Sequence, residues 1–284
     1  MRGFFLLLLI SGFPTWAGAA TVQMEIAPKI GASAEYMPGQ RDKPAVLVLH
    51  GFLQTRDFPT VATLARGLND AGYTVLTPTL SLGIPLRQQS LPCEAIHRHR
   101  MDDDIREIAR WVAWLKLRGH RSIVLIGHSF GSLQLLAYLN ARPDKAVKAY
   151  VGASLIEAKI GPVNRPALIA TLENRATSKQ SALMTHSLSL CKNYMSTPVG
   201  LLSYVRWDQA RTLAALRSLT VNTLLIMGDA DTMVEHNWIK ALKHIQVPMA
   251  VVPGANHFMD GQHEFDLLDK TLVFLGRLPK VAAK

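Results

Sequence analysis

One serine lies in a sequence context that is typical of an activated nucleophile. Residues 127–131 read Gly-His-Ser-Phe-Gly and place Ser129 at the centre of a G-x-S-x-G pattern. The short apolar run 122–126 precedes the pattern, and apolar residues at helical spacing follow it as far as Arg142. A strand, a tight turn between glycines and a helix form the setting in which such a serine lies at a sharp, strained apex. We therefore predict that Ser129 is a nucleophile.

A serine hydroxyl needs a base, and the base needs a carboxylate that orients it. Two later apolar runs are followed by side chains of these types. Asp229 and Asp231 come directly after the run 221–227, and His257 lies in the loop after the run 249–252. Because the carboxyl ends of parallel strands meet at one edge of a sheet, we expect these groups to lie near the nucleophile. Their order along the chain, Ser then Asp then His, is the one expected for a nucleophile on such a turn.

Apolar runs and amphipathic segments alternate along most of the chain. The predicted strands cover 44–50, 73–76, 122–126, 146–152, 221–227 and 249–252. The predicted helices cover 60–71, 105–119, 133–142, 235–244 and 264–275. This alternation predicts an α/β fold with a doubly wound, mostly parallel sheet and helices on both faces.

The segment 154–204 interrupts the alternation. It contains helix-like pieces, three prolines and many apolar side chains. Since a structureless loop of this length is improbable in a compact domain, we expect an inserted helical lid over the site. Leu183, Met184 and Leu188 are the candidates for binding an acyl group; packing of these residues on the sheet face is the alternative.

The first 19 residues have the pattern of a secretory signal. Arg2 precedes the apolar run 4–10, and Ala17-Gly18-Ala19 fits a cleavage site. A membrane anchor is the alternative, but the apolar run is shorter than the roughly 20 residues that span a bilayer. We therefore expect removal of residues 1–19, export to the periplasm or beyond the cell, and one α/β domain over 20–284.

The formal net charge of the chain is +10 at pH 7. A basic surface favours peripheral contact with an anionic envelope surface. The basic residues are scattered, and no basic run is interleaved with aromatic residues, which argues against a nucleic-acid partner. The sequence does not determine the oligomeric state.

The chain has two cysteines, Cys93 and Cys191. In an oxidising compartment we expect them to form a disulfide, and two free buried thiols are the alternative. Because no C-x-x-C occurs, the cysteines give no metal or redox motif.

Two polar clusters invite a metal assignment. The acidic residues 102–104 lie at the predicted start of a helix, where capping and the helix dipole favour negative charge without a metal. Glu94, His97 and His99 lie in a polar segment with spacing that is poor for zinc, and we expect a solvated loop there. We predict no metal site.

Four motifs, each after a predicted strand, resemble those of the α/β-hydrolase superfamily, and of its serine esterase and lipase branch most of all. They are His50-Gly51, residues 127–131, Gly228-x-x-Asp231 and residues 254–258. The resemblance covers about residues 44–276. It implies that Ser129 is the nucleophile, His257 the general base and acid, and Asp231 the orienting carboxylate, with Asp229 as the competing candidate.

The resemblance also implies an oxyanion hole made of main-chain N–H groups. Phe130 should supply one group and Phe52 the other, with Leu53 as the alternative to Phe52. His50 and His128 are then expected to be structural. The expected reaction is hydrolysis of a carboxylic ester, on a small-molecule or lipid-like substrate, through an acyl-enzyme and without a metal or cofactor. A thioesterase, an amidase or peptidase, an acyltransferase and a catalytically silent ligand-binding protein remain the alternatives.

Overall fold

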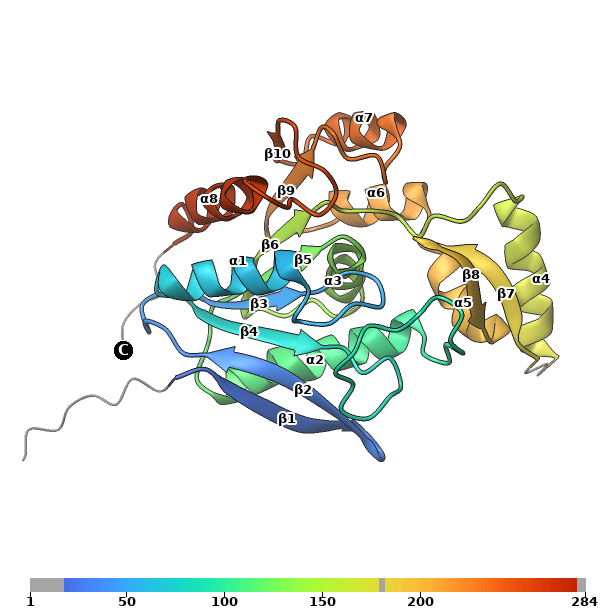
Figure 1. The fold of residues 1–284 in the computed structure, drawn as a ribbon, viewed down its shortest axis with the longest axis horizontal. Helices are drawn as coiled ribbons and strands as arrows, with labels where there is room; N and C mark the ends of the chain where they lie inside the picture. The colour runs from blue at the N-terminus through green and yellow to red at the C-terminus, as the bar shows by residue number, and fades with distance from the viewer. Residues whose placement is uncertain (1–17, 179–181, 280–284) are drawn as a thin grey trace, which may run out of the picture.

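An eight-stranded sheet forms the centre of the molecule. The computed structural model describes residues 18–178 and 182–279 (Figure 1), so residues 1–17 of the predicted signal sequence lie outside the described residues. The strand order is β1-β2-β4-β3-β5-β6-β9-β10. The pairs from β4 to β10 are parallel, and β1 and β2 form an antiparallel edge.

The bounds of the elements are as follows. The strands are β1 (Ala20–Ala27), β2 (Ile30–Met37), β3 (Ala45–Leu49), β4 (Thr74–Thr79), β5 (Ile123–His128), β6 (Val147–Ala153), β7 (Met184–Leu188), β8 (Cys191–Ser196), β9 (Asn222–Gly228) and β10 (Met249–Val252). The helices are α1 (Pro59–Asp70), α2 (Met101–Leu117), α3 (Phe130–Ala141), α4 (Arg165–Thr177), α5 (Pro198–Val205), α6 (Gln209–Arg217), α7 (His236–His244) and α8 (His263–Gly276).

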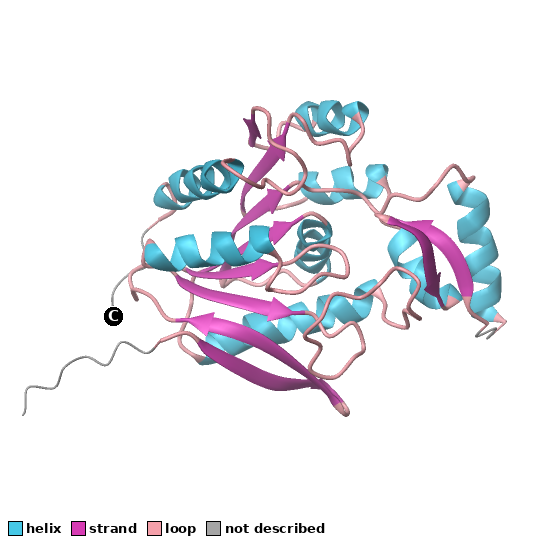
Figure 2. Ribbon diagram, viewed as in Figure 1, coloured by secondary structure: helices cyan, strands magenta, loops and turns pink. Residues whose placement is uncertain are grey.

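Helices cover both faces of the sheet (Figure 2). Strand β3 shows how the sequence divides between the two faces, because side chains alternate along a strand. Leu47 and Leu49 pack in one core with α2 and α3, whereas Val46 and Val48 pack in the other with α1 and α8. The strand is therefore apolar at every position, as expected of a parallel strand buried on both faces. The predicted doubly wound α/β fold is confirmed.

The antiparallel hairpin β1–β2 and the helix α6 were not predicted. In β1, Val22, Met24 and Ile26 face the core, and the residues between them are exposed. This alternation is the ordinary signal of a strand with one solvated face. No helix among the described residues has the length and apolar character needed to cross a membrane.

The inserted segment, residues 154–204, lies beside the carboxyl ends of the parallel strands (Figure 1). It contains α4 and α5, as the prediction of helices requires, but also an antiparallel hairpin, β7–β8. The insertion therefore contains the predicted helices together with two strands that were not predicted. The hairpin turns at Ser189, whose φ is 53°, and its strands bury Leu188 and Tyr194 against the rest of the protein.

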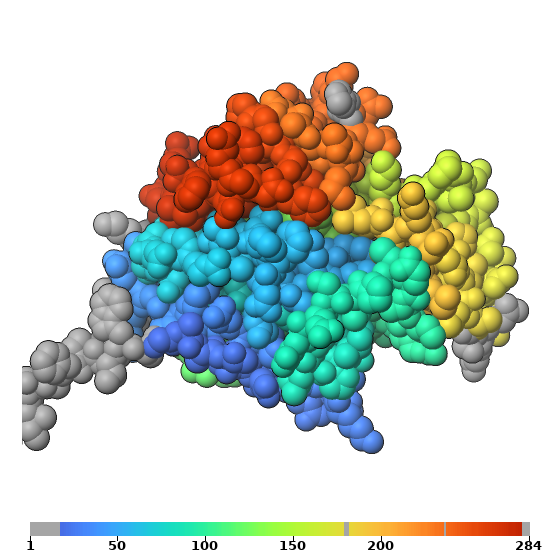
Figure 3. All heavy atoms as spheres, in the orientation of Figure 1, coloured from blue at the N-terminus to red at the C-terminus, as the bar shows by residue number. Residues whose placement is uncertain are grey.

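The segment between β4 and α2, residues 80–100, lies against this insertion. Figure 3 shows the two segments next to each other on one face of the molecule. An isolated bridge joins His97 to Ser196, and a disulfide joins Cys93 to Cys191 with 5.3 Å between their Cα atoms. The predicted disulfide is therefore present in the structure, and it links two segments that are 98 residues apart in sequence.

The disulfide should contribute a large part of the stability of the protein. Closing a loop of this length constrains the unfolded chain by up to about 4–5 kcal/mol in the chain-entropy model. We expect Cys93→Ser with Cys191→Ser to lower the free energy of unfolding measured in urea by a few kcal/mol. Thiol titration of the exported protein, denatured without reductant, should detect no free thiol, and two titratable thiols would refute the bridge.

Candidate active site

Ser129 occupies a strained turn between β5 and α3. Its φ is 56° and its ψ is −125°, a conformation that non-glycine residues rarely adopt. Neither glycine of the pattern has room for a side chain. A Cβ on Gly131 would lie 2.2 Å from the carbonyl oxygen of His50, and one on Gly127 would lie 2.5 Å from the Cα of Ser132. Both positions therefore require glycine, because the neighbouring main chain packs too closely for a side chain.

His257 and Asp231 lie next to Ser129, as predicted. The Nε2 atom of His257 is 2.7 Å from the Oγ of Ser129, and its Nδ1 atom is 2.7 Å from the Oδ2 of Asp231. The three residues are exposed by only 1%, 3% and 6% for His257, Ser129 and Asp231. With the Nδ1 proton donated to the carboxylate, Nε2 is left to accept the serine proton. A serine nucleophile, its base and an orienting carboxylate require this geometry.

Asp229 and Asp231 make different contacts in the structure. The Oδ1 of Asp229 accepts a hydrogen bond of 2.6 Å from the N–H of Gly254 and holds the two loops together. Asp231 instead contacts His257, and its second oxygen accepts a hydrogen bond of 2.8 Å from the N–H of Met233. Asp231 is therefore placed as the partner of His257, and Asp229 is a turn residue.

Gly228 determines how closely the loops after β9 and β10 approach each other. A Cβ at this position would lie 2.2 Å from the carbonyl oxygen of Ala255. Because Ala255 is two residues before His257 and Gly228 three before Asp231, this contact brings the histidine and the carboxylate within reach. Only glycine allows it.

The loop after β3 lies beside the nucleophile. A Cβ on Gly51 would be 3.3 Å from the Cβ of Ser129, and the N–H of Gln54 donates to the carbonyl of Gly51 at 3.2 Å to close a turn. The rings of Phe52, in this turn, and of Phe130, the first residue of α3, are in contact with centroids 4.7 Å apart and planes tilted by 56°. The N–H of Phe130 has no acceptor within its own helix, because the first turn of a helix leaves its N–H groups free. The two residues predicted to supply the N–H groups are thus adjacent in sequence to Gly51 and to Ser129, which lie next to each other.

Two further histidines are buried and neutral at pH 7. Burial lowers the pKa of His50 to about 3, and burial with the nearby His257 lowers the pKa of His128 to about 4. His50 donates from Nδ1 to the carbonyl of Gly51 at 2.9 Å and accepts at Nε2 from the N–H of Leu80 at 3.0 Å. His128 donates from Nε2 to the main-chain carbonyl of His257 at 2.9 Å. Both hold loops of the site in place.

A family model described as alpha/beta hydrolase family matches residues 46–267. The chain belongs to the alpha/beta hydrolase family. The match spans the strands and loops that carry Ser129, Asp231 and His257. No curated protein matches the sequence.

Many solved structures share the fold of this alpha/beta hydrolase. Est1E from Butyrivibrio proteoclasticus is 17% identical with a TM-score of 0.63 over 92% of this chain and 100% of its own. GrgF, an alpha/beta hydrolase from Penicillium sp. sh18, is 15% identical with a TM-score of 0.69 over 91% and 98%. The thioesterase domain from the curacin biosynthetic pathway is 16% identical with a TM-score of 0.59 over 90% and 99%. At these identities the likeness establishes the fold.

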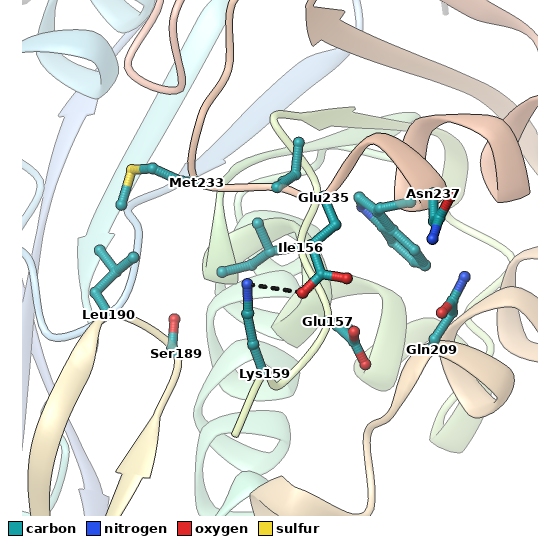
Figure 4. Close-up of a pocket in the computed structure, with 11 residues that line it drawn as sticks. Ile156, Glu157, Lys159, Ser189, Leu190, Gln209, Met233, Glu235 and Asn237 are labelled. Carbon is teal, nitrogen blue, oxygen red and sulfur yellow. Dashed lines mark ion pairs between the residues drawn. The ribbon is translucent and has the colours of Figure 1, made fainter. Parts of the chain in front are cut away.

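A cleft of this hydrolase adjoins the loop of Asp231 (Figure 4). About 490 Å³ of free space, open solvent included, lies between its walls, and the centres of water-sized spheres fit into about 40 Å³ of it. Its lining comes from the start and the hairpin turn of the insertion, from α6 and from the chain after Asp231, namely Ile156, Glu157, Lys159, Ser189, Leu190, Gln209, Met233, Val234, Glu235, Asn237 and Trp238. Five of these eleven side chains are apolar and six are polar or charged, and Lys159 and Glu235 form an ion pair of 3.0 Å.

The three residues predicted to bind an acyl group lie elsewhere. Leu188 is fully buried in the core, Met184 packs partly against that core, and Leu183 is partly exposed. The described lining of the cleft includes none of them and instead uses Leu190, from the same hairpin. Met233 and Val234 line the cleft and were not among the predicted binding residues, although two apolar residues soon after a candidate catalytic aspartate are a signal in the sequence.

The residues considered for a metal are engaged with protein groups. Asp103 caps α2 by accepting from the N–H of Arg100 at 2.9 Å. Asp104 is buried and accepts hydrogen bonds from Tyr204 at 2.6 Å and from Gln134 at 2.7 Å, so the prediction of capping is wrong for this residue. Among the described residues no group of three or more His, Cys, Asp or Glu side chains could hold a metal ion.

His97 and His99 are buried, with exposed fractions of 1% and 4%, so the prediction of a solvated loop is wrong for both. The ring of His97 stacks on Tyr194 of the insertion, with centroids 4.3 Å apart. The Nδ1 of His99 lies 2.6 Å from the hydroxyl of Tyr204. The insertion covers these histidines, which a reading of the local sequence does not reveal.

Proposed function

We propose that this alpha/beta hydrolase cleaves carboxylic esters through a Ser-His-Asp triad and an acyl-enzyme. The observation that carries the proposal is the chain of two 2.7 Å contacts from Ser129 through His257 to Asp231, all three buried. A histidine held in one tautomer by a buried carboxylate and placed on a strained serine has the geometry of covalent acyl transfer.

The steps follow from this geometry. His257 takes the proton of Ser129 as Oγ attacks the ester carbonyl, and Asp231 stabilises the imidazolium that forms. The negative charge on the carbonyl oxygen is then held by the N–H groups of Phe130 and Phe52. His257 returns the proton to the leaving alcohol, and water attacks the acyl-enzyme by the same route. Thioesters and amides could follow the same steps, and the ester is proposed on the resemblance of the sequence motifs to those of serine esterases and lipases.

We further propose that the inserted segment 154–204 is a lid and that the cleft under it accepts the acyl chain. The apolar part of its lining, namely Ile156, Leu190, Met233, Val234 and Trp238, suits an uncharged chain. The contact of one lining residue with the proposed triad supports this role, because the N–H of Met233 donates to the carboxylate of Asp231.

A series of p-nitrophenyl esters tests both proposals. We expect kcat/KM to rise by up to roughly fourfold for each added methylene from acetyl to octanoyl, because a buried CH₂ contributes about 0.8 kcal/mol. Leu190→Asp should lower kcat/KM for the octanoyl ester by at least about tenfold, since a carboxylate in the cleft opposes burial of the chain. The acetyl ester should be affected much less.

The matched control is Val163→Asp. Val163 belongs to the same insertion, is 48% exposed, similar to the 43% of Leu190, and lies outside the cleft lining. Val163→Asp should leave the dependence of kcat/KM on acyl length unchanged. If acetyl esters are preferred and Leu190→Asp changes nothing, the cleft does not bind the acyl chain. If no ester is cleaved at all, the proposed activity itself fails.

We also propose that the protein works outside the cytoplasm after removal of residues 1–19. The pattern of these residues and the disulfide between Cys93 and Cys191 support this proposal, because disulfides persist in oxidising compartments. Intact mass analysis of protein from the cell envelope should give a chain that begins at Ala20. Full-length protein recovered only from the cytoplasm would contradict it.

A further inference from the structure

Arg87 lies buried beneath the turn that carries Phe52. Its exposed fraction is 4%, and it belongs to the segment between β4 and α2. The Nε donates to the carbonyl of Leu80 at 2.8 Å, and Nη1 donates to those of Gln89 at 2.8 Å and Leu53 at 3.3 Å. The Nη2 donates to the carbonyl of Gln54 at 2.7 Å. One guanidinium thus joins its own segment to the turn 51–54.

The guanidinium of Arg87 is charged although it is buried, and removing a charge from water raises its free energy. Burial lowers the pKa of Arg87 to about 10, while the charges of Glu107 and Asp104 raise it, so the group remains protonated at pH 7. Its hydrogen bonds in the described structure all go to main-chain carbonyls. A buried charge without a carboxylate directly paired to it adds little to stability, because its desolvation offsets what the hydrogen bonds contribute.

The turn that Arg87 contacts is itself strained. Leu53 has a φ of 57°, in the left-handed region that a residue with a branched side chain rarely adopts. Its carbonyl accepts from both Arg87 and the N–H of Leu91, the latter at 3.0 Å. The surrounding hydrogen bonds therefore hold a conformation that the chain would leave if they were absent.

The orientation of the turn decides where the N–H of Phe52 points. In a trans peptide the C=O and the N–H point in opposite directions. The carbonyl of Gly51, in the same peptide as that N–H, is held by His50 and Gln54, and the carbonyls of Leu53 and Gln54 are held by Arg87. With these carbonyls engaged, the N–H of Phe52 keeps one direction beside Ser129.

We propose that Arg87 is a positioning residue for the oxyanion hole. It fixes the turn 51–54 so that the N–H of Phe52 is ready to receive the oxyanion and does not have to reorganise during the reaction. The proposal rests on the proposed function for its catalytic meaning, and its structural part, the fixing of the Phe52 peptide, stands independently of any activity.

The test compares Arg87→Met with wild type. Since removal of one oxyanion donor costs about 10²–10³ in kcat, we expect kcat on a p-nitrophenyl ester to fall by about 10²-fold, with KM changed less than about threefold. The inhibition constant of phenylboronic acid, which forms a tetrahedral adduct on serine, should rise in parallel with the loss of kcat. A merely structural role would not separate kcat from KM in this way.

A second readout needs no activity. In protein labelled with ¹⁵N-phenylalanine, the amide resonance of Phe52 should shift or broaden in Arg87→Met, while that of Phe130 should stay in place. Arg100→Met is the control, because Arg100 ends the same segment and bonds Asp103 through its side chain instead of the turn. It should leave kcat and the Phe52 resonance unchanged.

Arg87→Lys keeps the charge but cannot reach the carbonyls of Leu53 and Gln54 together, because Lys lacks the planar fork of Arg. We expect it to fold and to lose at least about tenfold in kcat, an effect in the same direction as the methionine variant. An unchanged Phe52 resonance together with unchanged kcat in the lysine variant would overturn the proposal. If the wild type neither cleaves esters nor binds the boronic acid, the proposed function fails, and the amide resonance still decides whether Arg87 fixes the turn.

Discussion

Ser129→Ala is expected to lower kcat on p-nitrophenyl butyrate by roughly 10⁶-fold, the size of effect seen when a serine nucleophile is removed. The substitution deletes the hydroxyl that lies 2.7 Å from the Nε2 of His257, and under the proposed mechanism it leaves only stabilisation by the oxyanion hole and binding. Since Ala is small enough for this buried position, the circular dichroism spectrum and the urea midpoint should change little. Initial rates on purified protein provide the measurement.

Ser154→Ala is the matched control for this substitution. Ser154 is also buried at the carboxyl edge of the sheet, where its N–H donates to the carbonyl of Ile226 at 2.8 Å, and its hydroxyl has no hydrogen-bond partner in the described part of the chain. We expect Ser154→Ala to retain most activity. Activity of Ser129→Ala within tenfold of wild type would place the nucleophile elsewhere.

Asp231→Asn is expected to lower kcat by about 10⁴-fold, because an amide in place of the carboxylate no longer holds the imidazole in the required tautomer. Asp231 contacts the Nδ1 of His257 at 2.7 Å, whereas Asp229 contacts only a main-chain N–H in the neighbouring loop. Asp229→Asn should therefore cost less than about tenfold, since it removes one loop hydrogen bond. Steady-state rates of the two variants give the ranking, and the reverse order would assign the role to Asp229.

The arrangement of the catalytic candidates could be predicted because it depends on signals that are local in sequence. Each of Ser129, Asp231 and His257 follows an apolar run, and parallel strands bring their carboxyl ends to one edge. The glycines add a second local signal, since the close contacts at Gly131 and Gly228 require the absence of a side chain. The alternation of Val22, Met24 and Ile26 with other residues also indicates strand β1, but this strand was not predicted.

The lining of the cleft could not be predicted in the same way. It joins the start of the insertion, the turn at Leu190 and the chain after Asp231, segments that tertiary packing alone brings together. Leu188 illustrates the difficulty, because its apolar character suits a substrate pocket and a core equally well, and the fold buries it in the core.

The polar residues of the segment 80–100 show a second limit. Sequence favours solvation for His97 and His99, yet Tyr194 and Tyr204 of the insertion cover them and provide aromatic and hydrogen-bond contacts. Arg87 donates to main-chain carbonyls of its own segment and of the turn 51–54. Burial of such groups depends on partners far away in sequence, and no local pattern of hydrophobicity reports it.

The most direct test of the central claim, that Ser129 is an activated nucleophile, is covalent labelling with a fluorophosphonate. After reaction of the exported protein, intact mass analysis should show one adduct, and peptide mapping should place it on Ser129. Labelling should disappear in Ser129→Ala and persist in Ser154→Ala. An adduct mapped to any other residue, or no adduct on folded wild-type protein, would contradict the account.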